Sequence, residues 1–222
     1  LLGTQMIAKG LDFANATLVG IINADTGLYL PDYRAGEKAF QLIYQSAGRS
    51  GRGKIPGEVV IQSYNPDNTV IDHAAKLELK KYYDVCLKER ESLDYPPFSW
   101  IVKLELRGTK KHQVENSINK ITNSIKQMPK GIEKLGPAYC YREKLKDNYR
   151  MQIIFKSQKK YDPVGTRLQK FYNSIIMNSK INVSKNPRLI VDVNPTSLLW
   201  QKKFSAFFFS VLLHIVNHHI KV

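Results

Sequence analysis

The chain has 222 residues, of which 43% are hydrophobic and 24% are charged, and this composition excludes an intrinsically disordered protein. The length predicts one or two domains, and the net charge of +15 favours a polyanionic partner, with nucleic acid ahead of an anionic membrane surface. Cys86 and Cys140 are too far apart and too few for a disulfide framework or a zinc site, so we expect reduced thiols, no bound metal and a cytoplasmic protein.

The first part of the chain has the pattern of a strand, a helix and a second strand. Residues 16–24 form a continuous apolar run, which is typical of a strand buried on both faces of a parallel sheet. Residues 35–47 carry apolar side chains at helical spacing, and residues 58–64 have the composition of a strand. This order predicts the last part of a doubly wound α/β lobe, which ends near residue 66.

A connecting segment over residues 67–98 follows this lobe. Residues 70–92 place apolar side chains at helical spacing among lysines and glutamates, which predicts one helix. Tyr95-Pro96-Pro97-Phe98 ends it, because proline lacks an N–H donor and disfavours the α conformation in the residue before it. We interpret this motif as a rigid hinge.

Residues 99–199 alternate between strand and helix patterns. The expected elements are a strand at 99–107, a helix at 111–127, strands at 137–143 and 149–156, a helix at 163–178 and a strand at 188–193. This β-α-β-β-α-β order is that of a ferredoxin-like α+β domain. Many unrelated modules share the order, so it does not assign a function by itself.

Residues 200–222 form an atypical apolar and basic tail. Its apolar stretch at 204–216 has about 13 residues, whereas a membrane-spanning helix needs about 20. We therefore expect no membrane partner, and we favour an aberrant C-terminal extension over an anchor.

The most informative motif is Gln45-Ser46-Ala47-Gly48-Arg49-Ser50-Gly51-Arg52. Two arginines lie three residues apart at a helix end, where both guanidinium groups can reach one phosphate. In nucleotide-driven motors such an arginine stabilises the charge on the γ-phosphate during its transfer. Taken alone, these eight residues also fit a glycine-rich helix end with two solvated arginines.

Together with the upstream segment Gly3–Phe13, this motif resembles motifs V and VI of superfamily 2 helicases. Other segments are similar to the PriA family of replication-restart helicases: Asn23–Asp25, Leu30–Ala35, Pro56–Pro66, Glu89-Arg90, Tyr95–Phe98, Gly136-Pro137 and Val191–Pro195. The resemblance covers residues 1–199. No phosphate-binding loop of the form G-x-x-x-x-G-K-[ST] occurs, and the sequence opens without Met, so we interpret the chain as a C-terminal fragment.

The resemblance implies that residues 1–66 are the C-terminal part of a second RecA-like helicase lobe. ATP and Mg²⁺ are then held mainly by a first lobe outside this chain, and the second lobe lends arginines to the γ-phosphate. Arg52 is the implied arginine finger, Arg49 its partner, and Gln45 the group that contacts the γ-phosphate or the attacking water. The implied nucleotide-site residues are Gly10, Asp12, Gly48 and Gly51, and the implied DNA-phosphate contacts are Thr4 and Lys9. The alternatives are a helix-surface amide for Gln45 and a plain βα loop with a structural aspartate for the upstream motif.

The resemblance also bears on metals and partners. Family members bind zinc through paired cysteines ahead of motif V, and that insertion is missing here, so zinc is not expected in this chain. The C-terminal region of the family contributes to binding of forked or single-stranded DNA. It also binds the acidic tail of single-strand DNA-binding protein, for which Arg167, Gln169 and Lys170 are the candidates here, and primosome proteins are further implied partners.

Basic and aromatic residues alternate around the predicted hairpin of the C-terminal domain: Tyr139, Tyr141, Arg142, Lys144, Lys146, Tyr149 and Arg150. Such mixtures can stack bases and bind phosphates. Arg142, Lys144 and Arg150 are the candidate DNA contacts. The alternative is a solvated hairpin with its tyrosines packed inward.

The implied function is that of an ATP-dependent 3′→5′ DNA helicase in replication restart and primosome assembly, with this chain forming half of the ATP cleft. The alternatives are a stand-alone DNA-binding fragment without ATPase activity and a non-functional truncated product. For the 222 residues alone we expect DNA binding and no ATP hydrolysis.

Overall fold

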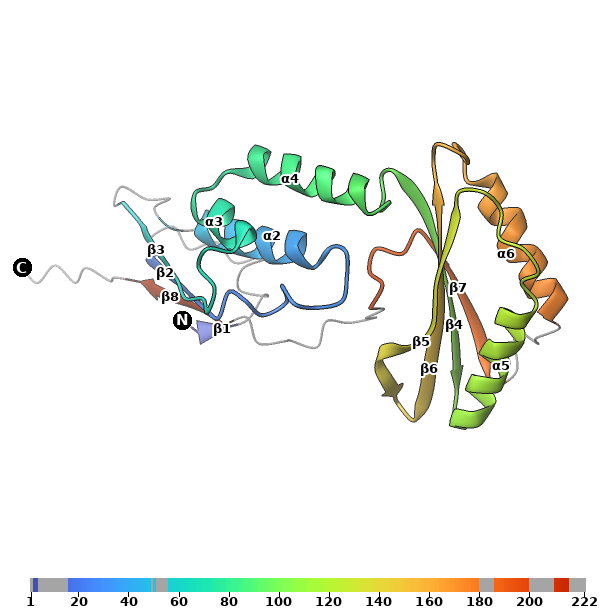
Figure 1. The fold of residues 1–222 in the computed structure, drawn as a ribbon. Coiled ribbons are helices and arrows are strands. Elements are labelled where there is room, and N and C mark those ends of the chain that lie inside the picture. Colours follow the sequence, from blue (N-terminus) through green and yellow to red (C-terminus); the bar gives the residue numbers. More distant parts are fainter. Residues whose placement is uncertain are drawn as a thin grey trace, which may run out of the picture. The chain divides into compact units, whose positions relative to one another are not determined.

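The computed structural model describes residues 2–3, 16–48, 50, 56–179, 186–199 and 210–215, with backbone alone for 2–3, 16 and 210–215. The chain is a mixed α/β protein whose two four-stranded sheets contain parallel and antiparallel pairs, as the expected α/β class requires. It divides into two compact units: unit 1 comprises residues 1–87 and 201–222, and unit 2 comprises residues 88–200. Figure 1 labels the elements of both units.

The sheet of unit 1 combines both ends of the chain. Its order is β1 (Leu2–Gly3), β8 (Ser210–Ile215), β2 (Ala16–Ile22) and β3 (Glu58–Ile61). Strands β2 and β3 are parallel, and β8 is antiparallel to both β1 and β2. Part of the tail is therefore a strand of this sheet, which its composition did not predict.

Three helices contribute to the core of unit 1: α2 (Ala35–Ala47), α3 (Thr69–Ala75) and α4 (Leu79–Ser92), whose residues after Leu87 belong to unit 2. Val19 and Ile21 of β2 are buried in the same cluster as Phe40 of α2. The Phe40 ring stacks on Tyr82 with centroids 4.1 Å apart. Ile22 is 40% exposed, so burial along β2 alternates, and the expected burial on both faces of this strand is wrong at this position.

The single helix expected over residues 70–92 is two helices in the structure. Leu77 has a φ of +56°, which interrupts the helical path between α3 and α4. His73 bridges the break twice, because its ring nitrogen lies 2.8 Å from a carboxylate oxygen of Glu78 and its carbonyl accepts the Glu78 N–H at 2.9 Å. The break lets both helices bury apolar residues in the core of unit 1.

Unit 2 follows the β-α-β-β-α-β order expected from the sequence. Its elements are β4 (Ser99–Gly108), α5 (Lys111–Asn123), β5 (Ile132–Leu145), β6 (Asn148–Gln158), α6 (Thr166–Ser179) and β7 (Arg188–Val193). The sheet order is β5-β6-β4-β7 with antiparallel pairs throughout. Helices α5 and α6 lie on the same side of the sheet (Figure 1).

The two faces of this sheet differ in chemistry. Leu104, Leu106, Ile153 and Phe155 are buried in one cluster with side chains of α5 and α6. Side chains alternate between the faces of a strand, so the residues between them point to the opposite face. There the buried residues include Lys103, Glu105, Arg150 and Lys156.

The β5–β6 hairpin is longer and tighter than expected. Strand β5 begins at Ile132 instead of residue 137, because a register shift between Leu135 and Ala138 accommodates Gly136 within the strand. Gly136 has a φ of +93°, and a Cβ there would lie 2.9 Å from the Gln152 carbonyl oxygen. Lys146 and Asp147, both with positive φ, make a two-residue turn that favours the right-handed twist of the strands.

Within the residues whose placement is given, no helix combines the length and the apolar composition that crossing a bilayer requires.

Candidate functional site

The structure describes five of the predicted site residues: Gln45 and Gly48 of α2 and Arg142, Lys144 and Arg150 of the hairpin. The others lie outside the described residues, and their roles stay predictions: Thr4, Lys9, Gly10, Asp12, Arg49, Gly51 and Arg52.

Helix α2 ends inside the arginine motif, and Gly48 is the residue that follows its last turn. The N–H of Gly48 donates to the Tyr44 carbonyl at 3.0 Å, with φ at −66°. A Cβ at Gly48 would lie 3.4 Å from the Tyr44 oxygen, which is ordinary contact. Among the residues that the structure describes, neither the backbone conformation nor packing therefore requires glycine at this position.

Ser50 fastens the end of this motif to the sheet of unit 1. Its Oγ lies 3.0 Å from the carbonyl oxygen of Glu58 and 3.4 Å from that of Thr17, so the one hydroxyl proton can be donated to either carbonyl, with Glu58 the nearer. Glu58 begins β3 and Thr17 lies near the start of β2. The sequence analysis missed this role, and the only signal was a hydroxyl residue between the two motif arginines.

Two aspartates within the segments that carry the resemblance are structural anchors. Asp25 is buried and accepts hydrogen bonds from Ser63 Oγ at 3.0 Å and from the Tyr64 N–H at 2.9 Å. Asp32 is also buried and forms a 2.6 Å ion pair with Lys38 of α2. These contacts connect the loop after β2 with the end of β3 and with α2, respectively.

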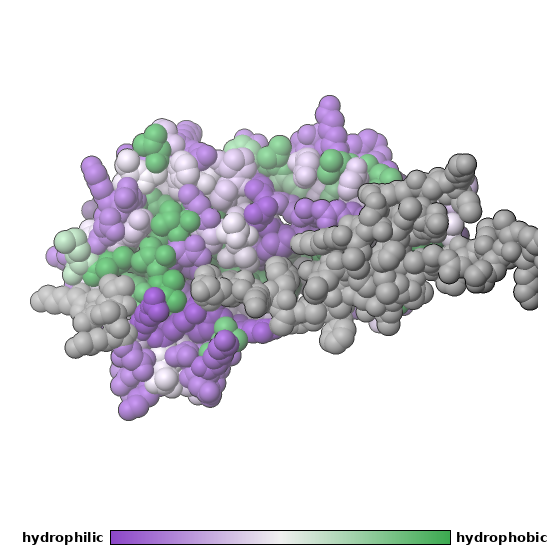
Figure 2. Space-filling model, turned by 180° about the vertical axis from the view of Figure 1, so that it is seen from behind, coloured by the Kyte–Doolittle hydropathy of each residue, from purple (hydrophilic) through white to green (hydrophobic). Residues whose placement is uncertain are grey.

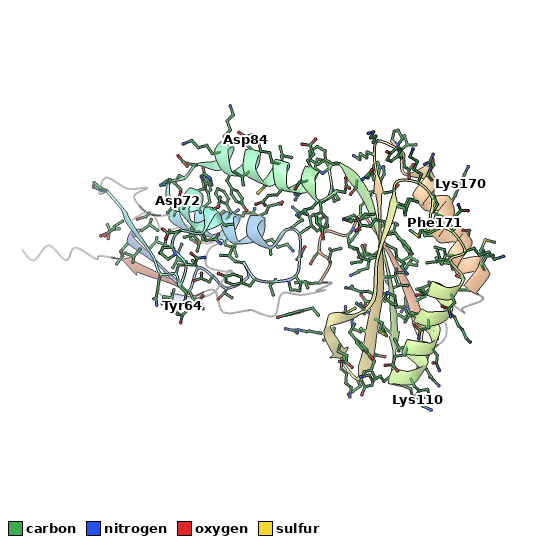
Figure 3. All side chains as sticks on the ribbon, viewed as in Figure 1. Tyr64, Asp72, Asp84, Lys110, Lys170 and Phe171 are labelled. Carbon is green, nitrogen blue, oxygen red and sulfur yellow. The ribbon has the colours of Figure 1, made fainter. Side chains whose placement is uncertain are left out.

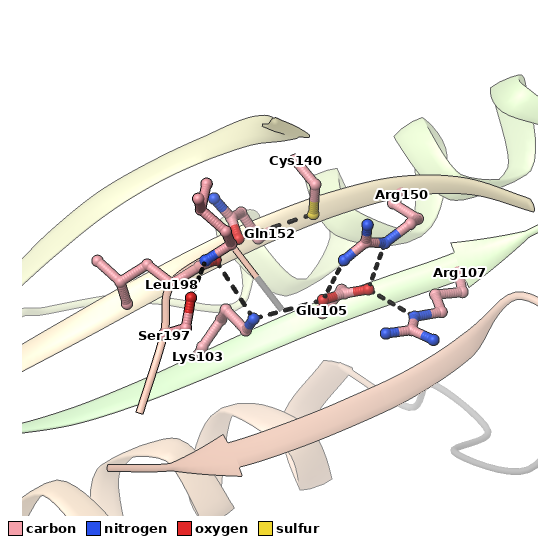
Figure 4. A network of polar contacts seen from close by, with 9 residues as sticks. Lys103, Glu105, Arg107, Cys140, Arg150, Gln152, Ser197 and Leu198 are labelled. Carbon is pink, nitrogen blue, oxygen red and sulfur yellow. Dashed lines mark hydrogen bonds and ion pairs between the residues drawn. The ribbon is translucent and has the colours of Figure 1, made fainter. Parts of the chain in front are cut away.

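Arg150 lies inside unit 2, which corrects the prediction that it contacts DNA. Its Nε and one Nη donate to the two oxygens of Glu105 at 2.7 and 3.1 Å, and it is 2% exposed (Figure 4). The same carboxylate pairs with Arg107 at 2.5 Å and with Lys103 at 3.6 Å. Because Arg107 and Arg150 are direct cross-strand neighbours, Glu105 offsets the repulsion between two like charges.

Burial and pairing act in opposite directions on this network. Burial alone would raise the pKa of Glu105, but hydrogen bonds from Arg150 and Arg107 hold it below its ordinary value. Burial lowers the pKa of Lys103 in spite of Glu105. Burial raises the pKa of Cys140 to about 11, with a further rise from Glu105, so this thiol is protonated at neutral pH. Cys86 and Cys140 are both buried, and neither forms a disulfide bond.

The tyrosines of the hairpin are of two kinds, partly buried and exposed. Lys144 lies over the Tyr149 ring and Lys111 over the Tyr139 ring, at 5.5 and 4.9 Å from the centroids. Both rings also pack against the core of unit 2, as the inward alternative predicted. Tyr141, in contrast, is 53% exposed, so among these three tyrosines it alone offers an open ring for stacking.

Helix α5 adds cations to this end of unit 2. Lys111 forms a 2.8 Å ion pair with Glu143 of β5, which ties the helix start to the hairpin. Lys110 lies at the same end (Figure 3) and is exposed. Hydrophilic side chains cover most of this end, where the β5–β6 turn and the start of α5 lie (Figure 2). Lys144 is exposed and pairs with Asp147 at 3.2 Å. Arg142 is less accessible and is partly buried. Lys110 and Lys111 are separated from the hairpin in the sequence, so the pattern of the hairpin alone did not predict them.

The first turns of α6 present Arg167, Gln169 and Lys170 to solvent. The buried carboxylate of Asp162 accepts the N–H groups of Arg167 and Leu168 at 3.1 and 2.9 Å, which fixes the start of the helix. Figure 3 shows Lys170 and its neighbour Phe171 on this helix, and Phe171 packs edge-on against Phe155 of the sheet. Arg167 and Lys170, three residues apart, lie on the same face of the helix, whereas Gln169 points away from Arg167.

Metal ligands are not grouped in the described part of the chain, where no three His, Cys, Asp or Glu side chains come close enough to share an ion. The expectation about zinc stays a prediction.

We predict opposite effects for Gly48→Ala and Ser50→Ala. The first should leave the free energy of unfolding unchanged or raise it by up to about 1 kcal/mol, because alanine restricts the unfolded chain and finds room here. The second should lower it by about 1 kcal/mol, because the carbonyl that accepts the hydroxyl proton loses its donor. Urea unfolding followed by circular dichroism measures both, and a clear loss in Gly48→Ala would mean that this glycine is structural.

We predict that Glu105→Gln destabilises unit 2 by about 3–5 kcal/mol, because it leaves buried cations without their carboxylate. Since the folded pKa of Glu105 lies below the ordinary 4.5, its contribution is present above that pH and is lost as the pH falls through the folded pKa. Urea unfolding between pH 3 and 7 should therefore show a weaker acid dependence in the variant. The control is Asp147→Asn in the β5–β6 turn of the same unit, whose carboxylate is largely exposed and should matter little.

Most of the chain is similar in sequence to known proteins. The family "Primosomal protein N C-terminal domain" matches residues 91–196. The chain is 38% identical over 196 residues to the replication restart protein PriA of Chlamydia pneumoniae, and 34% identical over 201 residues to that of Bacillus subtilis. It is 41% identical over 157 residues to that of Synechocystis.

These alignments cover 88%, 90% and 70% of this chain, respectively, but 25%, 24% and 19% of the relatives. The chain thus spans about a quarter of the length of the curated relatives that it matches. The matched part includes the C-terminal domain, and the chain belongs to the PriA family.

Proposed function

We propose that the chain is the C-terminal part of a replication restart protein that acts on DNA. The observation that carries this proposal is the identity of 34–41% to three proteins of that name over 70–90% of the chain. The net charge of +15 supports a nucleic-acid partner independently of the alignments.

The finer description of the fold belongs to the same proposal. In unit 1 the parallel pair β2–β3, joined through α2, is what the end of a RecA-like lobe requires. In unit 2 the β-α-β-β-α-β order, with the first and third strands adjacent at the centre of an antiparallel sheet, supports a ferredoxin-like domain. Residues 67–98 then connect the two.

In the complete protein this chain would supply half of an ATP cleft for a 3′→5′ helicase. Arg52 would stabilise the γ-phosphate, with Arg49 beside it and Gln45 at the phosphate or the attacking water. A first lobe would hold ATP and Mg²⁺. The contacts of Ser50 support the proposal, because they give the loop between the two arginines a fixed attachment to the sheet.

The DNA surface of unit 2 would be the end that carries the β5–β6 turn. Tyr141 would stack on a base, and Lys144, Arg142 and Lys110 would neutralise phosphates. Arg150 is excluded from this set by its pairing with Glu105. Single-strand DNA-binding protein would meet the exposed polar residues at the start of α6.

We predict that the 222-residue chain binds single-stranded DNA with an affinity that falls steeply with salt, because binding releases counterions. Tyr141→Ala should weaken binding about 5- to 100-fold at fixed salt, since it removes one stacking platform. Fluorescence anisotropy with a labelled oligonucleotide measures both effects.

The matched control is Tyr83→Ala on α4, because Tyr83 is also 53% exposed and lies in unit 1. It should bind DNA like the unsubstituted chain. Equal losses of DNA affinity in the two variants would show that Tyr141 does not have its proposed role. A DNA affinity that does not change with salt concentration would contradict the proposal of a nucleic-acid partner.

For a full-length protein that carries this sequence, we predict that Arg52→Ala abolishes DNA-stimulated ATP turnover and leaves DNA affinity nearly intact. The loss should be about 10³-fold or more, because the guanidinium acts mainly on the transition state. A coupled ATPase assay with and without DNA measures it, with Arg34→Ala, a half-exposed surface arginine paired with Glu37, as the control. Unchanged turnover in Arg52→Ala would refute the assignment.

A further inference from the structure

Strand β7 leaves one edge of the sheet of unit 2 open to a further strand. The sheet order ends at β7, so among the residues with described placement no strand pairs with its outer side. Two apolar side chains near this edge, Val191 and Val193, are 36% and 52% exposed.

The hydrogen-bonding direction of each β7 residue follows from one contact. The N–H of Asn194 donates to the carbonyl of Ile101 directly opposite, at 2.7 Å. In an antiparallel pair the residues alternate between bonding the neighbour and facing away from it. The even-numbered residues of β7 therefore bond β4, and Leu189, Val191 and Val193 direct their N–H and C=O groups to the open edge.

Two prolines limit the length of this open edge. Pro187 and Pro195 flank β7, and neither has an N–H to donate. Pro187 shares the outward direction of Val191, whereas Pro195 follows Asn194, whose φ of +50° ends the extended strand. A flanking strand can thus pair only with the short segment between them, which protects the edge against unlimited association.

The charges along β7 fit an antiparallel copy of the same strand. Arg188 and Asp192 lie two residues on either side of Ile190. If two copies pair with Ile190 opposite Ile190, the Arg188 of each chain faces the Asp192 of the other, and Leu189 faces Val191. This register is also the one in which the outward-directed residues oppose each other. Within the described part of the chain, no ion pair joins Arg188 or Asp192 to another residue, and Arg188 is exposed. On β4, Lys103 lies directly opposite Asp192, which favours the charged form of Lys103, and Arg107 lies directly opposite Arg188.

We propose that this chain self-associates as a two-fold symmetric dimer in which the two β7 strands pair antiparallel, centred on Ile190, and join two sheets into one of eight strands. A two-fold axis requires this antiparallel, self-complementary arrangement. Opposite charges across the pair set the register, and the prolines end it.

Charge reversal tests the proposal sharply. Arg188→Asp places two aspartates opposite two aspartates, and Asp192→Arg places arginines opposite arginines, so each variant should dimerise at least about tenfold more weakly. An equimolar mixture of the two variants restores every opposite-charge pair and should dimerise again. The double variant, Arg188→Asp with Asp192→Arg, should dimerise like the unsubstituted chain.

Sedimentation velocity of the 222-residue chain over about 1–300 μM measures these equilibria. Val191→Pro gives a second test, because it removes an outward N–H while the bonds of β7 to β4 stay in place. It should abolish the dimer, with circular dichroism and the unfolding midpoint confirming that unit 2 is folded. A chain that stays monomeric throughout, or single charge variants that dimerise as well as the unsubstituted chain, would overturn the proposal.

Discussion

The carboxylate of Glu105 is the interaction on which unit 2 depends. It lies on the central strand β4, opposite to the face covered by the helices, and it pairs with Arg150, Arg107 and Lys103. Burying three cations with one carboxylate is costly unless every pair is well formed. The antiparallel register places Arg107 against Arg150, so the sheet keeps its pairing only because this carboxylate lies between them.

Several segments that carry the family resemblance hold the fold together through side-chain contacts. Asp25 joins the end of β2 to the residues after β3, and Asp32 holds Lys38 of α2. Arg90 donates to the Pro96 carbonyl, and Lys156 donates to the Leu93 carbonyl, so the Tyr-Pro-Pro-Phe segment is fixed to unit 2. The interpretation of this motif as a rigid hinge stays a prediction.

The positive charge of the chain is divided between its interior and its surface. Lys103 and Arg150 balance Glu105 inside the sheet, whereas Lys144 and Lys110 face solvent at the end of unit 2 that carries the hairpin turn. Only the second group can release counterions from DNA. The net charge of +15 therefore overstates what a nucleic acid can meet.

The sequence by itself determined the order of elements in residues 99–199 and several bounds elsewhere, because hydrophobic periodicity is local: α2 and β7 have the bounds that their patterns predict. It also determined the family, through short motifs. Only the tertiary structure decided what depends on distant neighbours. The break at Leu77 follows from the contacts of His73 with Glu78 and from a shared core. Arg150 and Lys144, six residues apart on one hairpin, differ because one points to a buried carboxylate on another strand and the other to water, and no local pattern encodes that difference.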